Sequence, residues 1–411
     1  ILADGNTLTA SAGITVAQGN SLTIYCQQGG TGTLNAGGTS TPGNYAGIGG
    51  KWNIASPTTP GTGGTITING GNVTAQGGTY GAGIGGGNAG AVGSVTINGG
   101  TVTAIGGAGS TGIGGGYGGG GGTITINGGT VPATANSGNS SSQNCAGIGG
   151  GWSGNGGTIT INGGTVTATG SGTGAGIGRG SSSNVVAVGS CSITGDAVVF
   201  ATGGDSANGE HISATGGSSS WDGIVFQGNS GQLYGDVTLE DDLTIPDGAT
   251  LTVPSGTTLT VPEGVTVSGS ITNNGTINNS GTLPDNVGGS INVPSTVTVT
   301  VNPTTAAYGS TVSITANISQ ASSNALTRAA ANQVEFFVGT GDSRQSLGTA
   351  AVSNNTATLS NVSITTEKGW ALGDNTITAE YGGGTGLLGN SGTAILTVTA
   401  IPLDAPTGLA W

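Results

Sequence analysis

The chain has 411 residues, of which 90 are glycine, and its five basic and 18 acidic residues give a net charge of −13. No three-residue glycine period runs through it, which excludes a collagen triple helix, and the threonine, valine and isoleucine between the glycines favour strands over helices. The basic residues form no stripe, so we expect neither nucleic acid nor an anionic membrane surface as a partner. Because no apolar run is long enough to span a bilayer, we also expect no membrane insertion.

Two short phrases alternate along the first half of the chain. After an entry coil and a longer first repeat in residues 1–64, the phrase Thr-Ile-Thr-Ile-Asn-Gly-Gly-Asn-Val-Thr-Ala begins at Thr65, and its copies follow at intervals of 29 to 35 residues. A second phrase, Ala-Gly-Ile-Gly-Gly, lies between the copies. Self-similarity at this period, rich in β-branched residues and glycine, predicts a solenoid.

Each repeat predicts three short strands separated by tight turns, because asparagine and glycine tolerate the backbone conformation of a sharp corner. Three strands that close one coil and stack on identical coils form a parallel β-helix, and the rule for parallel crossovers makes it right-handed. Stacking would place equivalent side chains in ladders that run along the helix. The expected ladders are Ile68, Ile97, Ile126 and Ile161; Val73, Val102, Val131 and Val166; Ile48, Ile84, Ile113, Ile148 and Ile177; and, at a corner, Asn69, Asn98, Asn127 and Asn162.

The repeats weaken after Ile193, and we expect Asp222–Val225 to supply the last copy of the Gly-Ile strand. Residues 233–292 then change to an eight-residue rhythm, in which Leu243-Thr244-Ile245-Pro246 is followed by similar phrases that begin at Leu251 and Leu259. A strand of three residues, a proline and a glycine turn describe short solenoid corners. We expect this segment to continue the β-helix and to cap its open edge.

Residues 293–401 have a different pattern, with alternating strands separated by turn signals at about ten-residue spacing, which predicts an immunoglobulin-like sandwich without paired cysteines. The expected strands are Thr296–Val301, Thr311–Ile318, Gln333–Val338, Thr356–Val362, Asn375–Tyr381 and Thr393–Thr399. The predicted fold class is thus all-β: a right-handed parallel β-helix (solenoid) in residues 1–232, its short-period continuation and cap in 233–292, and the Ig-like β-sandwich in 293–401. Residues 402–411 resemble the start of a further, truncated β-sandwich.

Three cysteines, Cys26, Cys145 and Cys191, are too few and too scattered for a disulfide framework, and we expect them to be small buried apolar residues. No cysteine and histidine spacing suits a metal ion, so we expect no metal and no cofactor. Since the chain has neither a signal peptide nor a methionine, we interpret it as a piece of a larger secreted protein.

The repeated phrases, together with Trp221–Gly228 and Asp242–Pro246, resemble modules of large cell-surface proteins from Gram-positive anaerobes. Tyr308-Gly309-Ser310-Thr311-Val312 and Ile377-Thr378-Ala379-Glu380-Tyr381 are similar to bacterial Ig-like domains. The resemblance covers most of the chain. It implies an extracellular protein, wall-anchored or secreted, that serves in adhesion, and it carries over no catalytic residue.

Aromatic residues recur at one position of the coil, four residues after the isoleucine of the Gly-Ile phrase. This position holds Trp52, Asn88, Tyr117, Trp152 and Ser181. A spine of rings beside a flat glycine backbone suits stacking on sugar rings, and Asn88, Lys51 and Arg179 could bond to hydroxyl or carboxylate groups. The competing interpretation is that the rings only shield the glycine-rich surface.

Catalytic groups are sparse. Asp205, Glu210 and His211 form the only local acid–base cluster, and the Gly-x-Gly phrases lack the following helix that a nucleotide site needs. Glu240-Asp241-Asp242 with Asp247 offers carboxylates for Ca²⁺, but its spacing fits no calcium loop and favours a solvated corner.

We therefore expect a non-enzymatic bacterial surface adhesin, monomeric, that binds a glycan through the flank of the β-helix. Three alternatives remain open at this point: binding of a host protein such as an immunoglobulin or mucin, a polysaccharide-active β-helix enzyme, and a passive surface spacer.

Overall fold

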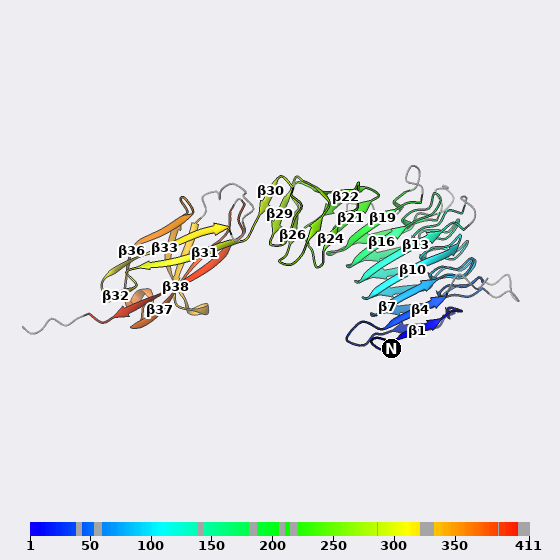
Figure 1. Ribbon diagram of the computed structural model, residues 1–411, viewed down its shortest axis with the longest axis horizontal. Helices are drawn as coiled ribbons and strands as arrows, with labels where there is room; N and C mark the ends of the chain where they lie inside the picture. Colours follow the sequence, from blue (N-terminus) through cyan, green and yellow to red (C-terminus); the bar gives the residue numbers. More distant parts are fainter. Residues whose placement is uncertain are drawn as a thin grey trace, which may run out of the picture. The chain divides into compact units, whose positions relative to one another are not determined.

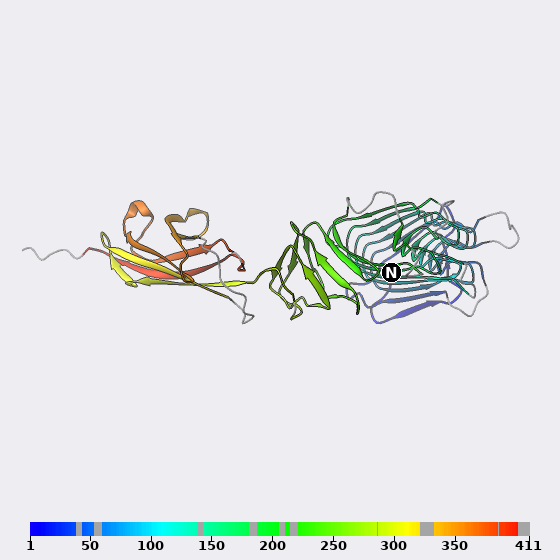
Figure 2. The ribbon, with the colours of Figure 1, turned by 90° about the horizontal axis from the view of Figure 1, so that it is seen from above.

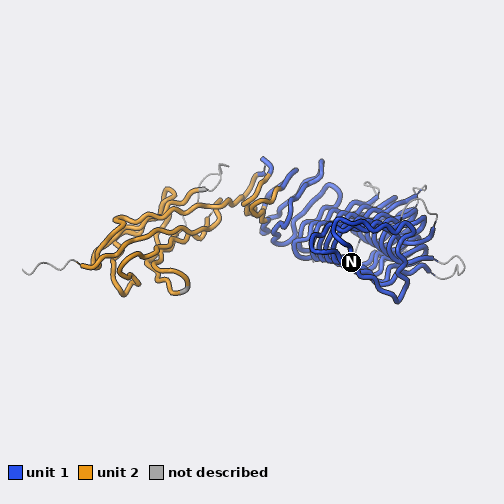
Figure 3. The backbone as a smooth tube through the Cα atoms, turned by 60° about the horizontal axis from the view of Figure 1, so that its bottom comes forward, with its two compact units in different colours: residues 1–259, 267–274, 284–287 blue, residues 260–266, 275–283, 288–411 orange. Residues whose placement is uncertain are grey.

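The computed structural model describes residues 1–37, 43–52, 60–138, 143–180, 187–204, 210–213, 221–285, 287–320, 333–384 and 386–401. They belong to two compact units, one of residues 1–259, 267–274 and 284–287 and the other of residues 260–266, 275–283 and 288–411 (Figure 3). Strands make up nearly all of the regular structure in both units, as the sequence predicts (Figure 1). The helical elements among the described residues are two short 3-10 turns, η2 (Gly341–Ser343) and η3 (Thr366–Lys368).

Three long sheets form the first part of unit 1, and successive strands of the chain visit them in turn (Figure 2). The first sheet begins with β1 (Thr7–Ala10), β4 (Thr33–Gly37), β7 (Asn72–Gln76), β10 (Thr101–Ala108), β13 (Thr130–Asn136), β16 (Thr165–Thr169), β19 (Val198–Thr202) and β21 (Gly223–Gln227). The second contains β2 (Ile14–Thr15), β5 (Ile48–Gly49), β8 (Ile84–Gly85), β11 (Ile113–Gly114), β14 (Ile148–Gly149), β17 (Ile177–Gly178) and β20 (Ile212–Ser213). The third contains β3 (Ser21–Ile24), β6 (Thr65–Ile68), β9 (Ser94–Ile97), β12 (Thr123–Ile126), β15 (Thr158–Ile161) and β18 (Ser190–Ile193). All of these strands pair in parallel, so this part is a parallel β-helix, called here the first solenoid.

The side-chain ladders expected from the repeats are confirmed. Ile126 pairs in register with Ile97 and Ile161, and Ile113 pairs with Ile84 and Ile148. These isoleucines are fully buried in one core, together with the valine ladder. The corner ladder is confirmed as well, because the Nδ2 atoms of Asn98, Asn127 and Asn162 each donate to the Oδ1 atom of the preceding asparagine at 2.6, 2.7 and 2.8 Å. Each coil therefore depends on its neighbours for both its core and its corner.

One position of the second sheet is glycine in each of the strands β5, β8, β11, β14 and β17, and only the end strands carry another residue there, Thr15 and Ser213. Gly114 has a φ of +133°, and a Cβ atom placed there would lie 2.1 Å from the carbonyl oxygen of Gly149 in the next coil. Gly85 and Gly149 have the same conformation and the same close contact with the following coil. The recurrence of Gly-Ile-Gly thus follows from how closely the coils approach on this side.

A hairpin ends the first solenoid and moves the core to the other face of the first sheet. β21 pairs antiparallel with β22 (Ser230–Tyr234), and β22 then pairs in parallel with β25 (Thr250–Val253), which continues to β28 (Ser270–Asn273). Val225 of β21 points into the first core, whereas the register places the buried Phe226 and Leu251 on the opposite face. At the hairpin, both the strand direction and the buried face of the first sheet reverse. The two reversals cancel, so the chain after the hairpin coils with the same handedness as the first solenoid.

The hairpin also corrects one expectation. Gly223–Gln227 does not supply the last Gly-Ile strand, because Val225 pairs with Val199 in the first sheet and Ile212 stacks on Ile177 in the second. The end of the first core is covered by Trp221 and Tyr234, whose rings meet edge to face at 5.5 Å. Tyr234 belongs to residues 233–292, the segment expected to cap the β-helix, whereas Trp221 precedes it.

The eight-residue phrases of residues 233–292 form a second solenoid. β24 (Leu243–Thr244), β25 and β26 (Thr258–Val261) lie in three different sheets, and β24 pairs with β27 (Val267–Ser268). One phrase therefore makes one side of a coil, and phrases do not stack on their immediate neighbours. A further short strand, β23 (Val237–Thr238), precedes β24.

Unit 2 contains β29 (Thr276–Asn279), which pairs with β30 (Ser290–Asn292), and then two further sheets. One sheet consists of β31 (Ser295–Asn302), β33 (Thr311–Gln320) and β36 (Thr356–Ser363). The other consists of β32 (Thr305–Ala307), β38 (Asn390–Thr399), β37 (Gly373–Tyr381), β34 (Gln333–Val338) and β35 (Gln345–Ala351). All six strands expected here are present, and the sequence analysis missed β32 and β35. Phe336 and Trp370 are buried in this part of the unit.

Candidate functional site

Three aromatic rings form a continuous column in the glycine-rich loops that flank the strands of the second sheet. The rings of Tyr117 and Trp152 are stacked, with centroids 4.9 Å apart and planes inclined by 27°. The ring of Tyr80 lies 4.9 Å from that of Tyr117, tilted by 58°. All three side chains are half-buried. We call these three residues the aromatic column.

Tyr80 is a member of the column that the sequence analysis missed. The aromatic spacing placed Asn88 in this coil, but Tyr80 precedes Ile84 of β8 by four residues, whereas Tyr117 follows Ile113 of β11 by four. The backbone fixes this exchange, because the Tyr117 amide donates to the Tyr80 carbonyl oxygen at 3.1 Å. The available signal was an aromatic residue in the glycine-rich loop on the other side of the Gly-Ile strand.

Trp52 and Lys51 belong to the coil of Ile48, two coils away from Tyr117 along the paired strands. Trp52 is half-buried, and its amide donates to the Asn44 carbonyl oxygen at 3.0 Å. Lys51 is exposed. Asn88 lies in the next coil, that of Ile84, which also supplies Tyr80 to the column; it is half-buried, and its carbonyl oxygen accepts from the Gly61 amide at 3.0 Å. At the expected aromatic position, four residues after Ile84, this coil therefore has Asn88 and no ring.

Stacking limits what the column offers a ligand. Rings that cover one another along the helix axis present their edges outward, where tyrosine and tryptophan carry their polar groups. The Tyr117 ring also packs against the backbone, since a Cβ atom on Gly109 would lie 2.5 Å from its Cδ2 atom. The column thus shields glycine backbone and at the same time presents ring edges.

Arg179, expected to contact a ligand, is held by an ion pair. Its Nη2 atom lies 3.0 Å from Oε1 and 3.1 Å from Oε2 of Glu210, and its side chain is only 11% exposed. His211 is also engaged, because its Nδ1 atom accepts a hydrogen bond from the Gly203 amide at 3.1 Å, and burial lowers its pKa. The expected acid–base cluster of Glu210 and His211 therefore serves contacts within the protein, whereas Asp205 lies outside the described residues, as does Ser181.

The acidic corner at Glu240–Asp242 is exposed to solvent, as is Asp247. Across the described ranges, no group of three or more histidine, cysteine, aspartate or glutamate side chains is arranged to hold a metal ion. In the same part of the chain, no helix has the length and apolar character needed to cross a membrane.

Two of the three cysteines are buried as expected. Cys191 takes the place of an isoleucine in the third sheet, paired with Ile159, and Cys145 has no exposed surface. Burial raises the pKa of each of these thiols to about 12. The expectation is wrong for Cys26, which is half-buried at the first coil and lies 3.9 Å from Oδ1 of Asp4.

Four segments of the first solenoid match the family model described as beta helix repeat: residues 66–88, 95–117, 124–152 and 159–178. The first match runs from β6 through β8, which is one full coil, and it includes Tyr80; the second and third end at Tyr117 and Trp152. No curated protein and no solved structure matches the chain. Because such repeats occur both in enzymes and in proteins without catalytic activity, the match identifies the architecture.

Proposed function

We propose that this chain belongs to a non-enzymatic bacterial surface adhesin that binds glycans through the flank of the first solenoid. The observation that carries the proposal is the aromatic column of Tyr80, Tyr117 and Trp152, a run of half-buried rings across three coils. Tyrosine and tryptophan combine an apolar ring with a polar edge, which suits sugars because they combine apolar C–H groups with hydroxyls.

The engagement of the acid–base groups supports a function without catalysis. A glycosidase needs two carboxyl groups that flank the scissile bond in a cleft. Glu210 is instead paired with Arg179, and the Nδ1 atom of His211 accepts a backbone hydrogen bond. The alternative of a polysaccharide-active enzyme is therefore less well supported by the described residues.

A second candidate function, a passive spacer, is favoured by the packing of Tyr117 over Gly109. In that case the column contributes stability alone.

The two-sheet arrangement of residues 293–401 supports an Ig-like domain. Together with the repeat phrases, it supports an extracellular location, wall-anchored or secreted, in a Gram-positive bacterium. A host protein such as an immunoglobulin or mucin is the alternative partner.

The test is a glycan-array screen of the chain beside a Tyr80→Ala/Tyr117→Ala/Trp152→Ala variant. A matched control is Tyr25→Ala, which removes an exposed ring outside the column. We expect the parent and the control to bind the same glycans and the triple variant, with unchanged circular dichroism, to lose them. Absence of any glycan signal from the parent, or equal binding by a folded triple variant, contradicts the proposal and leaves the spacer and the host-protein partner.

A further inference from the structure

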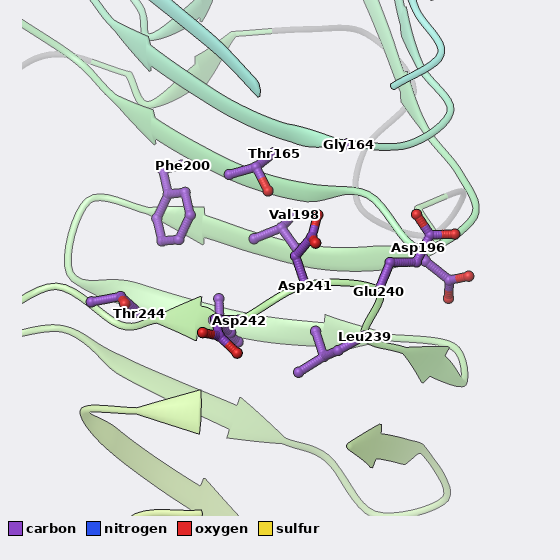
Figure 4. Close-up of a pocket in the computed structure, with 11 residues that line it drawn as sticks. Gly164, Thr165, Asp196, Val198, Phe200, Leu239, Glu240, Asp241, Asp242 and Thr244 are labelled. Carbon is purple, nitrogen blue, oxygen red and sulfur yellow. The ribbon is translucent and has the colours of Figure 1, made fainter. Parts of the chain in front are cut away.

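A pocket lies on the outer face of the first solenoid, where the segment around β24 crosses strands β16 and β19 (Figure 4). One side comes from the first sheet and the other from the start of the second solenoid. The lining residues are Gly164, Thr165, Asp196, Val198, Phe200, Leu239, Glu240, Asp241, Asp242, Leu243 and Thr244. This pocket is separate from the aromatic column, which belongs to the loops beside the second sheet.

The pocket has an apolar base. Val198, Leu239 and Leu243 are 8%, 3% and 3% exposed, and Phe200 is half-buried. The Phe200 ring is held in place by stacking on Phe226, with centroids 4.7 Å apart and planes inclined by 15°. Val198 and Phe200 belong to β19 and lie on the face of the first sheet where the core of the second solenoid begins, and Leu239 and Leu243 come from the second solenoid itself. The base can therefore accept an apolar chain.

The rim of the pocket is acidic. Asp196, Glu240, Asp241 and Asp242 all line it and are exposed, and none of its lining residues is basic. The Oδ1 atom of Asp196 accepts a hydrogen bond from the Thr238 amide at 3.0 Å. In the described residues of unit 1 the lysine and arginine side chains are Lys51 and Arg179, and Arg179 is paired with Glu210. Neither of them lines the pocket, so the rim carries a net negative charge.

We propose that this pocket binds a lysine side chain of a basic protein partner. The alkyl stem of a lysine would lie on Val198 and Phe200, and its ammonium group would lie among the rim carboxylates, near the aromatic ring. A compact ammonium group with three donors suits several separate carboxylates, whereas a guanidinium group prefers one carboxylate in a planar pair. The net charge of −13 favours encounter with a basic partner and disfavours a second copy of this chain.

The experiment measures saturation-transfer NMR of an acetylated and amidated Gly-Gly-Lys-Gly-Gly peptide with the full chain. We expect saturation of the lysine side-chain protons and a dissociation constant on the order of 1 mM, as is ordinary for a ligand of one side chain. The same peptide with an acetylated lysine, which lacks the charge, should give no signal. Two results overturn the proposal. One is the absence of transfer to the lysine peptide at a concentration of about 10 mM, tenfold above the expected dissociation constant. The other is equal transfer to the lysine peptide and the acetylated peptide.

Two variants locate the site. Asp241→Asn removes one rim charge, and Phe200→Leu keeps an apolar base but removes the ring; each should weaken binding by about two- to fivefold, because both groups are at least partly exposed. Glu263→Gln, at an exposed position outside the pocket, removes the same charge and should leave binding unchanged. Equal weakening by Glu263→Gln and Asp241→Asn would show non-specific attraction, and equal affinity for an arginine peptide would contradict recognition of lysine. Either result overturns the proposal without bearing on glycan binding by the aromatic column.

Discussion

Tyr117 and Trp152 occupy the same position in consecutive coils, and their ring centroids are separated by 4.9 Å. This separation matches the distance of about 4.8 Å between neighbouring strands of a sheet. The strands that precede the two rings, β11 and β14, pair in register, Ile113 with Ile148 and Gly114 with Gly149. The register of the backbone therefore sets the stacking of the rings, and the rings in turn stabilise that register.

The stacking predicts an energetic coupling between the two rings. In a double-mutant cycle of Tyr117→Leu and Trp152→Leu, we expect a coupling free energy of about 0.5–1.5 kcal/mol, because leucine retains apolar contact but loses the ring–ring interaction. The measurement is the free energy of unfolding in urea for the parent, both single variants and the double variant. A control cycle of Tyr117→Leu with Trp221→Leu, a ring at the end cap, should be additive. A coupling of zero in the first cycle would mean that the rings only share a surface.

The close approach of coils at the second sheet predicts a sharp difference between two glycines. Gly114→Ala should destabilise the chain by at least about 3 kcal/mol, because alanine rarely adopts its φ of +133° and the new Cβ atom would lie 2.1 Å from the Gly149 oxygen. Gly118→Ala is the matched control, since Gly118 also has a positive φ, +71°, but has nothing within 4 Å of the added atom. It should cost about 1–2 kcal/mol. Thermal unfolding measures both, and equal losses would refute the role of the inter-coil contact.

The ladders could be predicted from the sequence because one phrase recurs with a nearly constant length. Once Ile97 and Ile126 are equivalent, stacking fixes their pairing, and the same reasoning places Asn98 beneath Asn127. The glycines on either side of Ile113 recur in the same way, so they were equally predictable. Periodicity thus determines what is identical in every coil.

Features that occur once were not predictable from periodicity. Tyr80 reaches the aromatic column from the opposite side of its Gly-Ile strand, so its position relative to Ile84 differs from that of Tyr117 relative to Ile113. The change of core face at the hairpin had a weak signal, the consecutive apolar residues Ile224, Val225 and Phe226, which are buried on both faces of the sheet. Such a run is typical of a strand covered on both sides. The pocket depends on that change of face and therefore could not be inferred either.

The buried thiols predict a loss of stability at alkaline pH. Burial raises the pKa of Cys145 and Cys191 from 9.0 to about 12, so above pH 9 the unfolded chain releases protons that the folded chain retains. The folded state then binds more protons than the unfolded state, and stability falls as pH rises, by about 1 kcal/mol per thiol between pH 9 and 10. Urea unfolding at both pH values measures the change. A Cys145→Ala/Cys191→Ala variant should lose this part of the pH dependence, and an unchanged slope in that variant would contradict the assignment.

The corner ladder predicts that the cost of removing an asparagine depends on its place. Asn127 donates to Asn98 and accepts from Asn162, whereas Asn69 accepts from Asn98 and takes part in one ladder bond. Each bond contributes about 0.5–1 kcal/mol at this solvent-exposed edge, because water can replace a lost partner. Asn127→Ala should therefore reduce the free energy of unfolding by about twice as much as Asn69→Ala. Urea unfolding of the two variants tests this directly. Equal losses would mean that the Asn-Gly-Gly turn itself, which both variants alter in the same way, accounts for the recurrence of asparagine, and that the bonds between coils do not.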